Sequence, residues 1–194
     1  MILTLNLIKS HNPCQDGYAT LLRSLNKTEA DDEPLCLNHL LESNGVNDTM
    51  WVIFRCVDGR EIEKRNLLAD IVESVEYIWD EEYPEDKCIR NVIEELRNGG
   101  IEKEKLIELR NKVRNSISHA AAAVVNAVGY ATNAANAGNA ACYATDAASH
   151  AVFSCWHAKE KGVEERKKAK ENERERQKGM IRKWFGDLVM EGKS

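Results

Sequence analysis

Four side chains near the N-terminus have the spacing of zinc ligands. His11 lies three residues before Cys14, and Cys36 lies three residues before His39. A structural zinc ion needs four ligands in a tetrahedron, so the two pairs would have to converge. Cys14 and Cys36 fit better as small core residues, and His39 lies on a leucine-rich stretch. We expect neither a bound metal nor a cofactor.

A second group of reactive side chains lies late in the chain and comprises Cys142, His150, Cys155 and His157. A catalytic cysteine needs a base and a lowered pKa. His150 and Cys155 are five residues apart and therefore lie on different faces of a helix, and Asp146 is the only nearby acid. The sequence also lacks the phosphate-binding, nucleophile-elbow and metalloprotease motifs. We expect a protein that is not an enzyme.

The composition limits the class of protein. Of the 194 residues, 43% are hydrophobic and 30% are charged, with only 3 prolines. This hydrophobic fraction is too high for a disordered chain, and the apolar runs are too short for a membrane helix. The six cysteines form no CxxC pair, and no basic leader precedes the first apolar residues. These features favour a reduced protein of the cytoplasm.

The spacing of apolar residues predicts an all-α fold, a bundle of short N-terminal helices followed by a long, broken, alanine-rich C-terminal helix. Asn44-Gly45 predicts a helix stop, and the clearest amphipathic helix spans 60–82. The partial alternation of residues 2–8 indicates a short N-terminal strand. Candidate breaks in the long helix are 116–118, Gly129, Gly138 and Gly162.

Alanine dominates residues 119–158, where it occupies 16 of 40 positions. Small side chains recur there every seven residues, which favours close helix packing within one chain or between chains. The alternative is an inert rod, because alanine is the best helix former. The predicted packing seam consists of Ala120, Ala127, Ala134, Ala141 and Ala148.

The distribution of charge and the positions of helix-breaking residues divide the chain into three predicted segments. Residues 1–100 form an N-terminal helical domain, 101–158 the alanine-rich packing segment, and 159–194 a charged helical arm. Residues 1–158 hold 15 Lys+Arg and 24 Asp+Glu, a net charge of −9, whereas 159–194 hold 12 and 8, a net charge of +4. The acidic body disfavours nucleic-acid binding by the whole surface.

The end of the arm is amphipathic. It either docks back on the body or engages a partner, and the predicted partner-binding residues are Arg182, Lys183, Trp184 and Phe185. Binding of nucleic acid through the first three is a further alternative, which would weaken steeply with salt.

Three stretches resemble a family of alanine-rich helical proteins encoded by phages and prophages and often labelled immunity proteins. They are NPCQDGYATLLRSLNKTEADDEPL at 12–35, LESNGVNDTMW at 41–51 and EYPEDKCIRNVIE at 82–94. With the alanine tract, the resemblance covers about residues 10–155. It implies a phage setting but no activity and no catalytic residues. The asparagine-rich tract and the long charged tail depart from the family pattern.

These observations lead to three functional hypotheses. The first is a phage-encoded inhibitor that binds a host protein, such as a CRISPR effector or another defence component, in the host cytoplasm. The second is a homo-oligomer that sequesters a nucleotide signal in a pocket lined by Arg114, Asn133 and Asn136. The third is nucleic-acid binding through the arm. The chain could also form a homodimer through the alanine seam.

Overall fold

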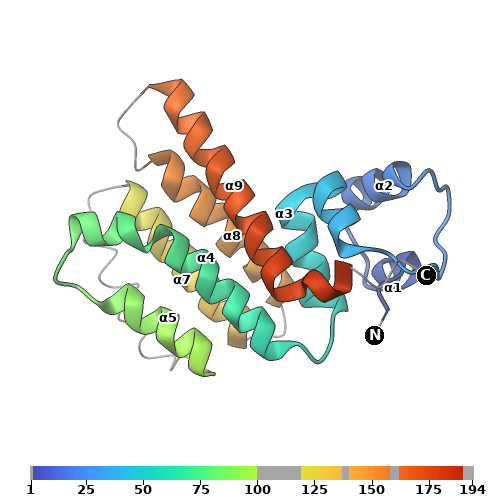
Figure 1. Cartoon of the computed structure of the whole chain (residues 1–194), viewed down its shortest axis with the longest axis horizontal. Coiled ribbons are helices and arrows are strands. Elements are labelled where there is room, and N and C mark those ends of the chain that lie inside the picture. Colours follow the sequence, from blue (N-terminus) through green and yellow to red (C-terminus); the bar gives the residue numbers. More distant parts are fainter. Residues whose placement is uncertain (1, 100–118, 137–139, 158–161, 190–194) are drawn as a thin grey trace.

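The computed structural model describes residues 2–99, 119–136, 140–157 and 162–189, and all of its regular structure is helical (Figure 1). The predicted all-α class is confirmed. In these residues there are eight α-helices and one 3₁₀-helix: α1 (Leu5–Ser10), α2 (Gln15–Ser24), α3 (Leu37–Cys56), α4 (Glu61–Glu82), α5 (Cys88–Asn98), α7 (His119–Asn136), α8 (Ala140–His157), α9 (Val163–Phe185) and η1 (Gly186–Val189).

The predicted N-terminal strand is wrong, because this segment forms α1 instead. Thr4 Oγ1 accepts a hydrogen bond from the Leu7 amide at 3.1 Å and so caps the helix. Leu5 and Ile8 are three residues apart, share one face of the helix and are both buried. The local cap and the buried pair therefore outweigh the partial alternation.

The Asn44-Gly45 stop is present as a break inside α3. Gly45 has φ 83° and ψ −174°, a backbone conformation that side chains other than glycine rarely adopt. Helical structure resumes at once, and Thr49 Oγ1 donates to the Gly45 carbonyl at 2.8 Å. The glycine thus divides α3 into two halves.

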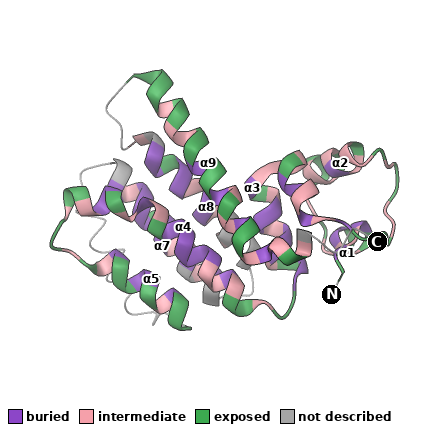
Figure 2. Ribbon diagram, in the orientation of Figure 1, coloured by how far each residue is buried: buried purple, intermediate pink, exposed green. Residues whose placement is uncertain are grey.

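The core is built around α4, which packs against α5, α7, α8 and α9. Leu67, Leu68, Ile71 and Val75 of α4 are fully buried. Figure 2 shows buried residues concentrated where α4 meets α7 and α8. The spacing of the apolar residues explains this arrangement, because it places them on the face of α4 that meets these helices.

The alanine tract forms two helices, α7 and α8, that pack against each other. Three members of the predicted seam, Ala127, Ala134 and Ala148, are buried within the chain. Ala120 and Ala141 lie in these helices, but their side chains are outside the described set. Gly129 lies within α7 and does not break it, whereas Gly162 is the N-cap of α9. Residues 116–118 and Gly138 lie outside the described residues.

The charged arm forms α9, which runs from the top of Figure 1 across α4 toward α3. It contacts α3, α4 and α8. Its C-terminal end buries Ile181 and Phe185. In the described part of the chain, no helix is long and apolar enough to cross a membrane.

Candidate functional site: a groove between α3, α8 and α9

The four predicted partner-binding residues all contact the body of the protein. Arg182 Nε donates to Asn38 Oδ1 at 3.1 Å, and the same guanidinium pairs with Glu42. The Lys183 and Trp184 side chains converge on one carboxylate of α4, as described below. Phe185 is fully buried. The polar groups of this segment are therefore satisfied within the chain.

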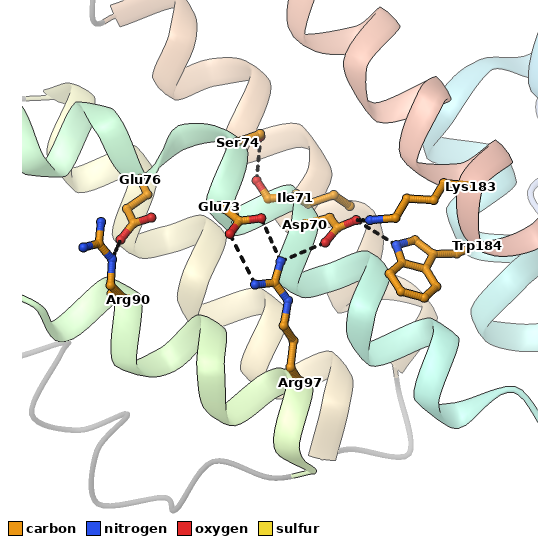
Figure 3. Close-up of polar contacts among 9 residues, drawn as sticks. All are labelled: Asp70, Ile71, Glu73, Ser74, Glu76, Arg90, Arg97, Lys183 and Trp184. Atoms are coloured by element: carbon orange, nitrogen blue, oxygen red, sulfur yellow. Dashed lines mark hydrogen bonds and ion pairs between the residues drawn. The ribbon is translucent and has the colours of Figure 1, made fainter.

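That carboxylate belongs to Asp70, and its set of hydrogen bonds is called the Asp70 contact (Figure 3). Lys183 Nζ and Trp184 Nε1 each donate to Asp70 Oδ2 at 2.8 Å, and Arg97 Nη2 donates to Oδ1 at 3.0 Å. Burial alone would raise the pKa of Asp70, but the hydrogen bonds from its three donors outweigh this effect and hold the pKa below its ordinary value. The contact joins α9 and α5 to α4.

A second carboxylate, that of Glu173, holds the middle of α9 and forms the Glu173 contact. It is 1% exposed and accepts from Ser74 Oγ at 2.7 Å and from Arg176 Nη1 at 3.1 Å. Gln177 Nε2 lies 3.3 Å from the same carboxylate and 3.0 Å from the Ala148 carbonyl, so α8 is included. Burial raises the pKa of Glu173, and its hydrogen bonds and the charge of Arg176 oppose this only in part.

With α9 held in this way, a groove of about 680 Å³ opens between three helices, here called the α3–α8–α9 groove. Its residues range from buried apolar to exposed and charged. They are Asn44, Gly45, Val46 and Asn47 of α3, Ser149, Val152 and Phe153 of α8, and Lys170, Glu171, Arg174, Glu175, Gln177 and Lys178 of α9.

The α3 wall of the groove lies at the glycine break. Asn44 Nδ2 donates to the Gly17 carbonyl at 2.7 Å and to Asp48 Oδ2 at 2.8 Å, which fixes the turn from inside. Asn47 Oδ1 lies 3.4 Å from Ser149 Oγ and connects this wall to α8. The wall is thus held in place from both sides.

The α8 wall supplies the apolar surface. Val152 is 8% exposed, whereas Phe153 beside it is 50% exposed. The Phe153 ring is held edge-on by the His157 ring, with the centroids 4.3 Å apart. On its other side the His150 ring lies 6.5 Å away between centroids, and His150 in turn stacks on Tyr130 at 5.1 Å. A large apolar side chain is therefore oriented by its neighbours but only half covered.

The α9 wall carries alternating rows of charge. Lys170, Arg174 and Lys178 are four residues apart and follow one face of the helix. Lys178 is paired with Glu42 at 3.5 Å and with Glu175 at 3.0 Å. Within the described residues, Arg174 makes no ion pair, and the same is true of Glu171 one row away.

Of the two groups of His and Cys side chains singled out in the sequence, those that the structure describes do not lie in the groove. Ser24 Oγ lies 2.9 Å from His39 Nε2, and the thiol of Cys14 accepts the Gly17 amide at 3.4 Å. No group of three or more His, Cys, Asp or Glu side chains among the described residues could hold a metal ion. Cys155 is buried, with its sulfur 4.0 Å from Glu173 Oε2.

Of the other predicted residues, those whose side chains the structure describes do not line the groove. His150 is half-buried, and burial lowers its pKa although the Asp146 charge opposes this. Asn133 is half-buried on α7. Asn136 lies on α7 with its side chain undescribed, as does Cys142 on α8, and Arg114 is outside the described residues. The hypothesis of a pocket built from Arg114, Asn133 and Asn136 stays a prediction.

Sequence reasoning missed the groove, although two local signals belonged to it. The Asn44-Gly45 stop marks its α3 wall, and the four-residue spacing of Lys170 and Arg174 marks its α9 wall. Nothing local joins these signals, since more than 100 residues separate them. Comparisons of the chain with models of known families, with characterised proteins and with solved structures found no match.

Proposed function

We propose that the protein is a non-enzymatic interaction protein that binds a host protein and inhibits it, with the α3–α8–α9 groove as its contact surface. The observation that carries this proposal is that one groove contains both a half-exposed Phe153 and an Arg174 that makes no ion pair with the residues the structure describes. Aromatic and arginine side chains dominate binding energy at protein interfaces. The resemblance to phage-encoded proteins supports a host defence component as the partner.

The groove is also suited to binding because its walls are held before any partner arrives. Asn47 and Ser149 connect α3 to α8, and Gln177 connects α9 to α8. Ordering of loops and side chains opposes association, so walls that are already ordered favour it. The buried floor residues Val46 and Val152 add an apolar surface at the base.

Capture from a bacterial host lysate tests this proposal. The tagged full chain serves as bait beside a groove variant, Phe153→Ala with Arg174→Glu. The matched control is Ile62→Ala with Lys168→Glu, since Ile62 and Lys168 are both exposed and neither lines the groove. We expect a stoichiometric host protein with the wild type and the control but not with the groove variant.

The captured protein is then purified, and its activity is measured with and without the chain. Loss of that activity with the wild type alone would support inhibition. Capture that is equal for all three baits, or a captured protein whose purified form does not bind, would contradict the proposal.

A nucleotide is the second candidate for the same groove. Its volume lies within the roughly 300–1,000 Å³ typical of small-molecule sites. The Phe153 ring could stack on a base while Arg174 contacts phosphate. Glu171 and Glu175 in the same wall oppose a polyphosphate, so we place this function second. A rise in melting temperature with cyclic nucleotides or ADP-ribose derivatives, lost in the groove variant, would favour it.

A further inference from the structure

We infer that the groove recognises an extended segment of its partner in which a carboxylate side chain lies close to an apolar one. This inference rests on the proposed function, because it names the chemistry of the partner at the same site. The observations behind it are the charges of the α9 wall and the exposed Phe153 ring of α8.

The carboxylate is assigned to Arg174. This guanidinium has no ion pair within the described residues, whereas the charge of Lys178 is already shared by two glutamates. Arginine binds a carboxylate through two parallel hydrogen bonds, which fixes orientation as well as distance. Lys170 lies one helical turn away on the same wall. An acidic side chain is thus the complementary group.

The apolar side chain is assigned to the surface of Val152 and Phe153. Phe153 is 50% exposed and His157 restrains its ring, so a partner side chain can cover the ring without first ordering it. Burial of this area is favourable in proportion to the apolar surface removed from water. Because Phe153 and Arg174 line the same groove, one short segment of the partner can contact both.

The negative residues of the α9 wall explain why a protein segment fits better than a polyphosphate. Glu171 is unpaired in the described part of the chain and lies one row from Arg174. It would repel several adjoining phosphate charges, whereas one carboxylate can bind Arg174 and place neutral main chain near Glu171.

Selection of displayed random 12-residue peptides against the full chain tests the inference. We expect the enriched peptides to combine Asp or Glu with a nearby aromatic or aliphatic residue. A synthetic peptide of the enriched sequence is then labelled with fluorescein, and its dissociation constant is measured by polarisation. For Arg174→Glu and for Phe153→Ala we expect affinity to fall about tenfold each.

Two matched variants sharpen the test. Glu171→Lys should raise affinity about threefold because it removes a repulsive charge and adds an attractive one. Lys168→Glu reverses a charge on the same helix outside the groove, so its affinity should stay within about twofold of wild type. Circular dichroism of each variant confirms that the helices remain folded.

Enriched peptides without acidic residues, or a failure to enrich any peptide that depends on Phe153 and Arg174, would overturn the inference. Stabilisation by ADP-ribose or cyclic nucleotides that is lost in both variants would overturn it in favour of the nucleotide. If host capture still depends on the groove, the proposed function stands and only the assigned chemistry fails. If capture is also independent of the groove, both fail.

Discussion

The middle and the C-terminal end of α9 carry similar residues but face different surroundings. Arg174 and Arg182 lie on the same row of the helix, eight residues apart. Arg182 meets Asn38 and Glu42 of α3, whereas Arg174 faces the groove and has no ion-pair partner among the described residues. The type of residue therefore does not decide whether a charge is structural or available for binding. The acceptors on the facing helices decide it.

The aromatic residues show the same contrast. Phe185 at the docked end is fully buried, and Phe153 in the groove is 50% exposed. The docked end stabilises the fold, because its apolar and polar groups are both satisfied by the body. The groove has groups left over, which is the property expected of a binding surface. Variants that separate stability from binding can test this division.

The largest expected effect is on the docked end. Phe185→Ala should lower the free energy of unfolding by about 3–5 kcal/mol, because it removes a fully buried ring and leaves a cavity. Phe153→Ala should lower it by no more than about 1 kcal/mol, since half of the ring already faces water. Urea unfolding followed by circular dichroism measures both. Equal losses of stability in the two variants would contradict the division between a docked end that stabilises the fold and a groove that serves binding.

The next effect concerns the Asp70 contact. Asp70→Asn keeps the shape but removes the charge that accepts from Lys183, Trp184 and Arg97. We expect a loss of about 1–3 kcal/mol at neutral pH, reduced from the sum of three bonds because Lys183 and Arg97 are partly exposed. Glu171→Gln in the groove should change stability by less than about 0.5 kcal/mol. Thermal unfolding of Asp70→Asn and of Glu171→Gln compares the two effects directly.

Asp70 also determines part of the dependence of stability on low pH. Because the pKa of Asp70 is lower in the folded chain, its stabilisation is complete above the ordinary aspartate value, about 3.9, and is lost as pH falls toward the folded value. Asp70→Asn should therefore flatten the loss of stability below about pH 4. Urea unfolding as a function of pH measures this. If Asp70→Asn loses stability below about pH 4 as steeply as the wild type, the assigned hydrogen bonds are contradicted.

A smaller effect of opposite sign is expected at Glu173. Its pKa is raised by burial, so the folded chain keeps this proton over a pH range in which the unfolded chain has lost it. The free energy of unfolding should fall as pH rises from about 4.3 through the raised value, and Glu173→Gln should remove this slope. The amide still accepts from Ser74, so the helices stay joined. A steeper slope in the variant would contradict the assignment.

Much of the fold follows from local sequence. The spacing of apolar residues predicted α4 at 60–82, and it spans Glu61–Glu82. The Asn44-Gly45 stop corresponds to a real break, since glycine at φ 83° is a local requirement. The strand at 2–8 was wrong because a helix cap at Thr4 and two buried residues decided the local structure.

The groove could not be predicted in the same way. Asn47 and Ser149 are 102 residues apart, and Arg182 and Glu42 are 140 apart. An amphipathic segment such as 180–189 has the same pattern whether it docks on its own chain or on a partner. The positions of Glu42 and Asp70 show that the charges of Arg182 and Lys183 are used within the chain. That information lies in tertiary packing.

The central claim is that the middle of α9, which lines the groove, contacts the partner, and that its docked C-terminal end does not. Titration calorimetry of the captured host protein with Arg174→Glu and Arg182→Glu tests it with two charge reversals on one helix row. The account predicts that Arg174→Glu weakens binding about tenfold with little change in stability. Arg182→Glu should lose up to about 1 kcal/mol of stability and keep its affinity within about threefold. Loss of binding in Arg182→Glu with full binding in Arg174→Glu would contradict the account.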